Sequence, residues 1–171
     1  MNCCCFEFAY ITLNENWFIM GQMIIEKNVI INKSLDVVFN YLKQTKNQDS
    51  FSVWNMKDPT MKKTYSGTDG TAGFIYSWDS TDKNVGAGSQ EITNIIENSR
   101  IDYMLRFERP MKNTGISSFI LSKIDDNATS VTWNFISPTK FPFSLFAPII
   151  KNMLGKQINT SLQNLKALLE K

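Results

Sequence analysis

The stretch IKNMLGKQINTSLQNLKALL, residues 150–169, decides the fold. Its apolar residues recur in steps of three and four, which is the period of an amphipathic helix with one apolar stripe. Lys166 and Lys171 lie in or near the last turns, where cations interact favourably with the helix dipole. The stripe consists of Ile150, Met153, Leu154, Ile158, Leu162, Leu165 and Leu169. The pattern predicts one long helix near the C-terminus, with an apolar side that needs a partner surface.

The segment before this helix alternates apolar and polar residues over short runs, the pattern of half-buried β-strands. Turn residues such as Asn98-Ser99 and Asp125-Asp126-Asn127 separate the later runs. Short turns between neighbouring strands favour an antiparallel meander with one apolar face. The expected strands are residues 61–66, 72–78, 86–97, 100–107, 114–123 and 130–137.

The main body begins with residues 24–31, IIEKNVII, whose β-branched residues are typical of a strand. A short helix follows, with Ser34 as its N-cap and an apolar stripe of Val37, Val38, Tyr41 and Leu42. Residues 47–54 indicate a second short helix or a turn, which ends before Pro59. The predicted order is a strand, two short helices, a run of strands and one long helix, an α+β fold.

The composition excludes several kinds of active site. The 171-residue chain has 43% hydrophobic and 12% aromatic residues, a formal net charge of +2 and no histidine. Its length fits one domain with a sizeable core. Without histidine there is no Ser-His-Asp or Cys-His nucleophile system and no histidine-ligated metal. The near-neutral charge argues against a nucleic-acid partner.

The N-terminal residues 1–22 stand apart from this pattern, and we expect an extension that precedes a domain of residues 23–171. Its three cysteines, Cys3, Cys4 and Cys5, are contiguous, so they neither form a disulfide framework nor match the spacing of a zinc site. We expect no metal and no cofactor. An irregular extension, an added strand at residues 6–13 and an upstream start codon before Met20 or Met23 are the alternatives.

Residues 6–20 are apolar but contain Glu7, Asn14, Glu15 and Asn16, and no basic residue precedes Lys27. A spanning helix needs about 20 largely apolar residues, and a secretory signal needs a basic start. We therefore expect no stable membrane insertion and a cytoplasmic protein.

Several short motifs occur in a set order along the chain. They are Lys57-Asp58-Pro59 ahead of Tyr65-Ser66-Gly67, then Tyr76-Ser77-Trp78, Val85-Gly86-Ala87-Gly88, Phe107 with Pro110, Val131-Thr132-Trp133, and the closing MLGKQINTSLQNLKALLEK with its Leu-Gly pair and Leu-x-x-Leu-Lys run. Together with the order of elements, they resemble the START/polyketide-cyclase (SRPBCC) superfamily, in particular its bacterial polyketide cyclase/dehydrase-type members. The resemblance covers residues 23–171.

The resemblance implies a helix-grip fold, in which a curved antiparallel sheet wraps around the long C-terminal helix. It also implies a cavity between them for a hydrophobic small molecule, such as a lipid, a polyketide or another polycyclic compound. Packing arguments agree, because a strongly curved sheet cannot lie flush against one straight helix, and the remaining space is lined by apolar side chains. Many such members carry an apolar membrane anchor before the domain, and this chain has only the polar-interrupted residues 6–20 there.

The residues expected to line this cavity follow from the apolar parity of each strand and the stripe of the helix. Aromatic residues on the inner face of a sheet are more often plain core, so a ligand role competes with that interpretation. The candidate ligand-binding residues are Trp54, Phe74, Tyr76, Trp78, Gln90, Ile92, Tyr103, Leu105, Phe107, Phe119, Trp133, Phe135, Met153 and Ile158. Trp54 is expected near the mouth of the cavity.

Gln90 is the most informative of these positions because a buried amide needs a hydrogen-bond partner. Either a ligand or water satisfies it inside the cavity, or a bulge turns it outward. Gly86 and Gly88 fit a bend or bulge better than a phosphate loop, because GAGSQE matches no phosphate-binding motif. Gly155 either kinks the helix or lets the sheet or a ligand approach closely.

Three functions remain open: non-enzymatic binding of a hydrophobic molecule, a cyclase or dehydrase acting on a polyketide-like substrate, and a partner-binding regulatory module. An enzyme needs a positioned acid or base. The carboxylates of the strands are expected on the solvated face or at strand ends; they are Asp79, Glu91, Glu97, Asp102 and Glu108. Only Tyr76, Tyr103 or a rim carboxylate such as Glu26 could serve, so we expect no catalytic residue and favour binding.

Overall fold

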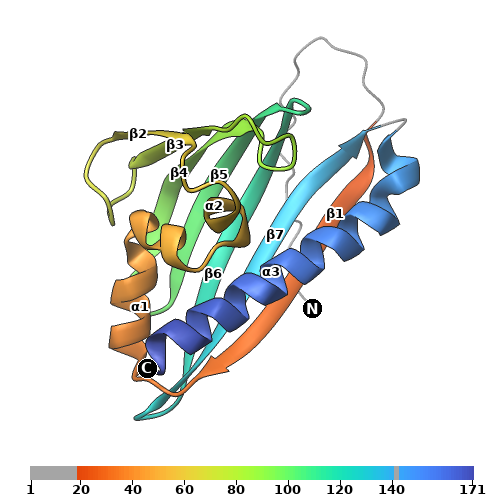
Figure 1. Cartoon of the computed structure of the whole chain (residues 1–171). Helices are drawn as coiled ribbons and strands as arrows, with labels where there is room; N and C mark the ends of the chain where they lie inside the picture. The colour runs from red at the N-terminus through yellow and green to blue at the C-terminus, as the bar shows by residue number, and fades with distance from the viewer. Residues whose placement is uncertain (1–18, 141–142) are drawn as a thin grey trace, which may run out of the picture.

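The computed structural model describes residues 19–140 and 143–171, so the predictions for residues 1–18 lie outside it. The elements are β1 (Ile19–Ile31), α1 (Leu35–Lys43), η1 (Thr45–Ser50), α2 (Val53–Lys57), β2 (Lys62–Ser66), β3 (Ile75–Asp79), β4 (Ala87–Ile96), β5 (Arg100–Arg109), β6 (Asn113–Asp125), β7 (Ala128–Lys140), η2 (Phe143–Phe146) and α3 (Ala147–Leu169). They form the predicted helix-grip arrangement, with a curved sheet on one side and α3 laid across it (Figure 1).

The sheet has seven strands in the order β1-β7-β6-β5-β4-β3-β2, and every neighbouring pair is antiparallel. Strands β2 to β7 follow one another as the predicted meander. The first strand adds beside the last, with Ile25 opposite Phe135 and Val29 opposite Val131. Since side chains alternate between faces along a strand, this register puts the apolar parity of all these strands on one concave face.

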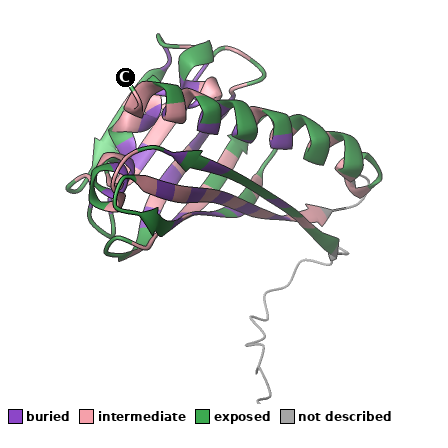
Figure 2. Cartoon of the chain, turned by 90° about the horizontal axis from the view of Figure 1, so that it is seen from below, coloured by how far each residue is buried: buried purple, intermediate pink, exposed green. Residues whose placement is uncertain are grey.

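The two halves of α3 have different environments. The C-terminal half buries Ile158, Leu162 and Leu165 against the sheet, close to α1 (Figures 1 and 2). The N-terminal half exposes Ile149 to 70% and Met153 to 51%. Burial of apolar surface is the main favourable term in folding, so the C-terminal half anchors the helix. The N-terminal half stands over a part of the sheet that it does not fill.

The short helices differ from the predicted pattern in one position. Helix α1 buries Val38, Phe39 and Leu42, whereas Val37 is 46% exposed. The prediction of Val37 in the apolar stripe was therefore wrong, because Phe39 takes the buried place. Helix α2 is tied to α3 at its start, where the Val53 backbone N–H donates to Ser161 Oγ at 3.1 Å. The second predicted helix consists of the 3₁₀ turn η1 followed by α2.

Two glycines shape the start of β4. Gly86 has a left-handed φ of +67°, which side chains with a Cβ rarely adopt. The pairing of β4 with β5 shifts between Ala87 and Gly88, so the predicted bulge is present. A Cβ on Gly88 would lie 2.8 Å from the Trp78 ring. At Gly155, by contrast, a Cβ would meet Ile25 Cγ2 at 3.7 Å, an ordinary contact, so the approach of β1 to α3 does not require a glycine there.

Strand β1 begins at Ile19, inside the stretch expected to be an extension, and β7 continues past Pro138 to Lys140. The pairing of β7 with β6 ends at Ile136, so the proline lies beyond that neighbour. Among the helices of residues 19–140 and 143–171, none is both long and apolar enough to cross a membrane.

Candidate ligand-binding cavity

A cavity of about 1010 Å³ lies between the inner face of the sheet, α2 and the N-terminal half of α3. Its wall includes most of the residues expected there: Trp54, Tyr76, Trp78, Gln90, Tyr103, Leu105, Phe107, Phe119, Trp133, Phe135, Met153 and Ile158. Phe74 and Ile92 do not belong to the wall and lie in the hydrophobic core, at 1% and 0% exposure. Both positions share the inward parity, but the layers close completely over them.

Aromatic rings in edge-to-face and tilted contacts form much of the wall. Phe119 and Trp133 lie 4.7 Å apart between ring centroids, and Trp54 of α2 packs against Trp133 at 6.4 Å and 72°. Toward the other side of the cavity, Phe107 contacts Trp78 at 6.2 Å and Phe135 at 6.4 Å. Such rings are rigid, and each contact adds to the burial of apolar area. The wall is therefore held in shape by its own side chains.

Gln90 points into the cavity and not outward. The register shifts of β4 flank it, at Ala87/Gly88 and at Ile92/Asn94, so Gln90 itself stays opposite Tyr76 on β3 and Leu105 on β5. Its side chain is 8% exposed and forms no hydrogen bond with another residue in the described ranges. The amide faces the open space of the cavity, and its nitrogen and oxygen are not fully enclosed by protein atoms.

Tyr76 belongs to a short chain of polar contacts that reaches the surface. The Asn55 amide nitrogen donates to the Tyr76 hydroxyl at 3.3 Å and to Asp49 Oδ1 at 2.7 Å. Asp49 Oδ1 also pairs with Lys63 Nζ at 2.8 Å. Burial, and then the charge of Asp49, raise the pKa of Tyr76 far above its usual range. The hydroxyl is therefore protonated at neutral pH.

Tyr103 is more deeply buried, at 1% exposure, and its hydroxyl donates to the Leu42 carbonyl at 3.5 Å. Burial also raises the pKa of Tyr103 far above its usual range. Both wall tyrosines are thus neutral hydrogen-bonding groups at physiological pH and not general bases.

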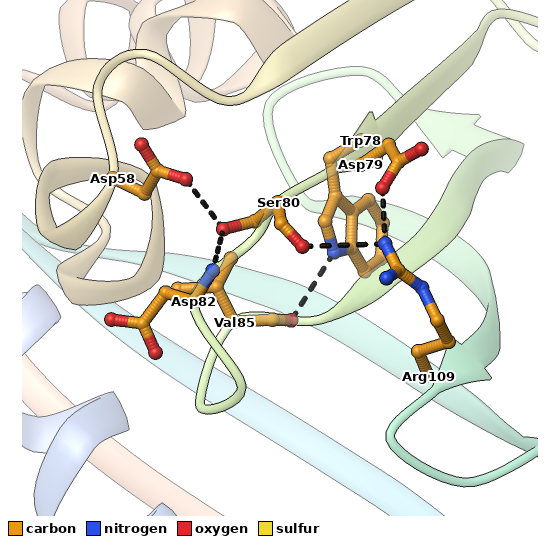
Figure 3. A network of polar contacts seen from close by, with 7 residues as sticks. All are labelled: Asp58, Trp78, Asp79, Ser80, Asp82, Val85 and Arg109. Carbon is orange, nitrogen blue, oxygen red and sulfur yellow. Dashed lines mark hydrogen bonds and ion pairs between the residues drawn. The ribbon is translucent and has the colours of Figure 1, made fainter.

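The charged residues of the wall are Arg109, at the end of β5, and Lys112, in the following loop. Arg109 forms an ion pair with Asp79 and donates to the Ser80 carbonyl at 3.2 Å (Figure 3). The Ser80 hydroxyl donates in turn to Asp58 Oδ2 at 2.5 Å. This network joins the end of β5 to the β3–β4 connection beside Trp78. Within the described residues, no carboxylate lines the cavity.

The carboxylates lie elsewhere, mostly as predicted. Glu91 pairs with Arg106 at 2.8 Å, and Asp102 pairs with Arg100 at 2.7 Å, on the outer parity of β4 and β5. The prediction that Glu26 lies at the rim was wrong. Glu26 is exposed on β1 and borders a separate shallow depression against α3. Its parity is opposite to that of Met23, the residue of β1 that lines the cavity.

Sequence reasoning missed several polar wall residues. Gln48 and Asn55 come from η1 and α2, where short irregular turns give no periodicity to follow. Ser117 shares the parity of Phe119 and was within reach of the strand argument. Its hydroxyl accepts a 2.8 Å hydrogen bond from Trp133 Nε1. In the part of the chain that the structure describes, no group of three His, Cys, Asp or Glu residues could hold a metal.

No protein-family model and no curated protein sequence matches the chain. Solved structures of low sequence identity do share its fold. A hypothetical protein from Helicobacter pylori, jhp0584, has a TM-score of 0.66 at 10% identity, with 96% of this chain and 99% of that chain covered. The Aha1 dimer of Colwellia psychrerythraea has a TM-score of 0.59 at 16% identity, with 86% and 96% covered.

The di-domain ARO/CYC StfQ from the steffimycin biosynthetic pathway has a TM-score of 0.65 at 11% identity. The alignment covers 87% of this chain and 51% of that chain. The chain therefore shares the helix-grip fold of these structures, so the fold that the resemblance implied is confirmed.

Proposed function

We propose that this protein binds a hydrophobic small molecule, of lipid, polyketide or other polycyclic kind, in the cavity between the sheet and α3. The observation that carries the proposal is the cavity itself, about 1010 Å³ inside a wall of aromatic and aliphatic side chains. Protein interiors are normally packed to crystal-like density with few voids. Pockets of about 300–1,000 Å³ with apolar walls are typical of small-molecule sites.

The chemistry of the wall supports binding over catalysis. Tyr76 and Tyr103 stay protonated, and Arg109 is engaged with Asp79. These groups can orient a ligand, and they offer no general base at neutral pH. The proposed role is therefore to hold a molecule away from water.

Native mass spectrometry of the full chain after mild extraction tests the proposal. A co-purifying lipid or aromatic compound at one copy per chain is the expected result. A second experiment uses the neutral dye N-phenyl-1-naphthylamine, whose fluorescence rises in apolar surroundings. Wild type should bind it saturably, and an empty preparation that binds neither dye nor lipid would contradict the proposal.

A matched pair of variants places that binding inside the cavity. L105W introduces a large ring at a wall position, whereas I116W introduces the same ring on the outer face of β6, where Ile116 is 48% exposed. The proposal predicts that L105W weakens dye binding at least tenfold and that I116W leaves it unchanged. Equal binding by wild type, L105W and I116W would place the dye elsewhere.

A cyclase-type enzyme is the second candidate, favoured by the likeness to StfQ and to DynU16, a protein of the dynemicin biosynthetic locus with a TM-score of 0.61 at 15% identity. In that case the Tyr76 hydroxyl would act as a hydrogen-bond donor to a substrate carbonyl. Conversion of a linear poly-β-ketone to a cyclised, dehydrated product, lost in Y76F, would favour this candidate. Binding of the same compound without conversion would favour the first. The partner-binding alternative stays a prediction.

A further inference from the structure

The unpartnered Gln90 amide is the most unusual feature of the cavity. It is 8% exposed, and the described residues around it give its side chain no hydrogen bond. Its amide atoms are not among the fully enclosed polar atoms that lack a partner, so they face the open space of the cavity. The residue opposite it on β5 is Leu105, so apolar side chains are compatible with this layer. The amide is therefore available to a group that enters the cavity.

The hydroxyl of Tyr76, on the neighbouring strand, has a proton that can be donated to a ligand in the cavity. Asp49 can only accept hydrogen bonds, so the Asn55 amide turns its nitrogen toward Asp49 and Tyr76. The Tyr76 oxygen is then the acceptor in its contact with Asn55. Its own proton has no acceptor among the described residues and remains available to the cavity. Lys63 holds Asp49 from outside, which keeps this orientation fixed.

These two groups converge because of the strand register. Tyr76 and Gln90 are directly opposite on β3 and β4, and both side chains belong to the cavity wall. Cβ atoms of such pairs lie about 4.5–5.5 Å apart. Both side chains therefore enter the same cavity from neighbouring positions, where one ligand can contact the Tyr76 hydroxyl and the Gln90 amide.

The charges around this pair select a neutral oxygen over an anionic one. The carboxylate of Asp49 contributes to the raised pKa of Tyr76, so its field opposes a second negative charge there. Arg109 lies four residues along β5 from Leu105, about 13 Å away at the spacing of a strand, and is paired with Asp79. Lys63 is already paired with Asp49 at 2.8 Å, and a carboxylate buried beside Gln90 would lose its hydration.

We propose that Tyr76 and Gln90 form a subsite for a carbonyl or hydroxyl oxygen, so that the preferred ligand is a neutral ketone or alcohol with a large apolar body. This inference rests on the proposed function, since it requires that the cavity takes up an apolar molecule. Beyond that function, the subsite defines the chemical class of the ligand and its orientation, with the oxygen directed toward Tyr76 and Gln90.

Four probes with one ring system test it: pyrene, 1-acetylpyrene, 1-pyrenemethanol and 1-pyrenecarboxylate, titrated against the full chain by fluorescence. The ketone and the alcohol should bind about tenfold more tightly than pyrene, since two hydrogen bonds that satisfy buried groups are gained. The carboxylate should bind no more tightly than pyrene. A tightest-binding carboxylate would overturn the inference.

Substitution at the subsite should remove the difference between the probes. Q90L is expected to bring the affinity for 1-acetylpyrene close to that for pyrene, while pyrene binding stays the same. Y76F should reduce the preference severalfold. S89A, at the neighbouring outward position of β4, is the matched control and should retain it. A preference for the ketone that persists in both Q90L and Y76F would contradict the subsite.

The melting temperature of the empty protein gives an independent readout. If Gln90 serves a ligand, Q90L melts at or above the temperature of wild type, because the protein loses no internal hydrogen bond. A strongly destabilised Q90L would instead assign Gln90 a structural role and overturn the inference. Failure of all four probes to bind wild type would contradict the proposed function itself. Equal affinity for all four would contradict only the subsite.

Discussion

The same substitution, glycine to alanine, should have opposite effects at Gly88 and Gly155. In G88A the new Cβ would lie 2.5 Å from the Arg106 carbonyl oxygen and 2.8 Å from the Trp78 ring. Ordinary contact begins near 3.4 Å, so the backbone of β4 or β5 has to move by about 0.9 Å. Such a movement lowers the stability of the protein, because it strains the hydrogen bonds between β4 and β5 and displaces the Trp78 ring.

Overpacking of this kind costs about 1–3 kcal/mol. For a domain of this size, a loss of about 2 kcal/mol lowers Tm by roughly 4–8 °C. Trp78 belongs to the cavity wall, so its displacement should also weaken binding of N-phenyl-1-naphthylamine.

G155A is the control, because space exists at that position. Its Cβ would meet Lys27 Cε at 3.4 Å and Ile25 Cγ2 at 3.7 Å, and a lysine side chain can adjust. Alanine is favoured over glycine inside a helix by about 1 kcal/mol. G155A should therefore raise Tm by roughly 2–4 °C.

Thermal unfolding followed by circular dichroism measures both variants, and urea unfolding checks that the slope of the transition is unchanged. A G88A protein that melts within 1 °C of wild type would refute the close-packing argument at β4. A G155A protein as destabilised as G88A would show that α3 and β1 lie closer than these distances allow.

Three further predictions concern buried polar groups. S117A should cost about 1–3 kcal/mol in urea unfolding, because the Trp133 indole N–H loses its acceptor. Burial alone would raise the pKa of Asp102, but hydrogen bonds from Ser118 and Arg100 hold it below its usual value. This carboxylate therefore stabilises the fold above its unfolded pKa near 3.9, and the contribution disappears as pH falls through the lower folded pKa. S118A should destabilise the protein more at pH 6 than at pH 2.5, and an equal loss at both would contradict the ionic role. Because burial raises the pKa of Tyr103, the free energy of unfolding should fall as pH rises above about 10. The phenolate absorbance of Tyr103 should appear only when the protein unfolds. Titration of all tyrosines in the native protein below pH 11 would contradict this prediction.

The sequence by itself determined which side of each strand faces inward. Tyr76, Gln90 and Leu105 were placed on the inner face by alternation alone, and the register brings them side by side. Alternation is a property of the extended backbone, so it needs no knowledge of distant contacts. The long helix was equally predictable, because its apolar stripe follows the helical period over residues 150–169.

Only the tertiary structure decided which inward residues are core and which are wall. Phe74 and Ile92 have the same parity as Tyr76 and Gln90, yet the first pair is sealed and the second faces open space. Phe74 and Ile92 lie in the closed core, whereas open space remains beneath the N-terminal half of α3, where Met153 is exposed. The gap between two layers depends on many non-local contacts, and no period within one strand records it.

The polar partners of the cavity were decided in the same way. Asn55 reaches Tyr76 from a short helix 21 residues earlier, and Glu26 lies outside the cavity wall although Met23 of the same strand belongs to it. Periodicity fixes a direction for each side chain, whereas proximity between separate elements is set by packing of the whole chain. The sequence thus predicts which side chains face inward, whereas the cavity and the unpartnered Gln90 amide in its wall result from the packing of separate elements.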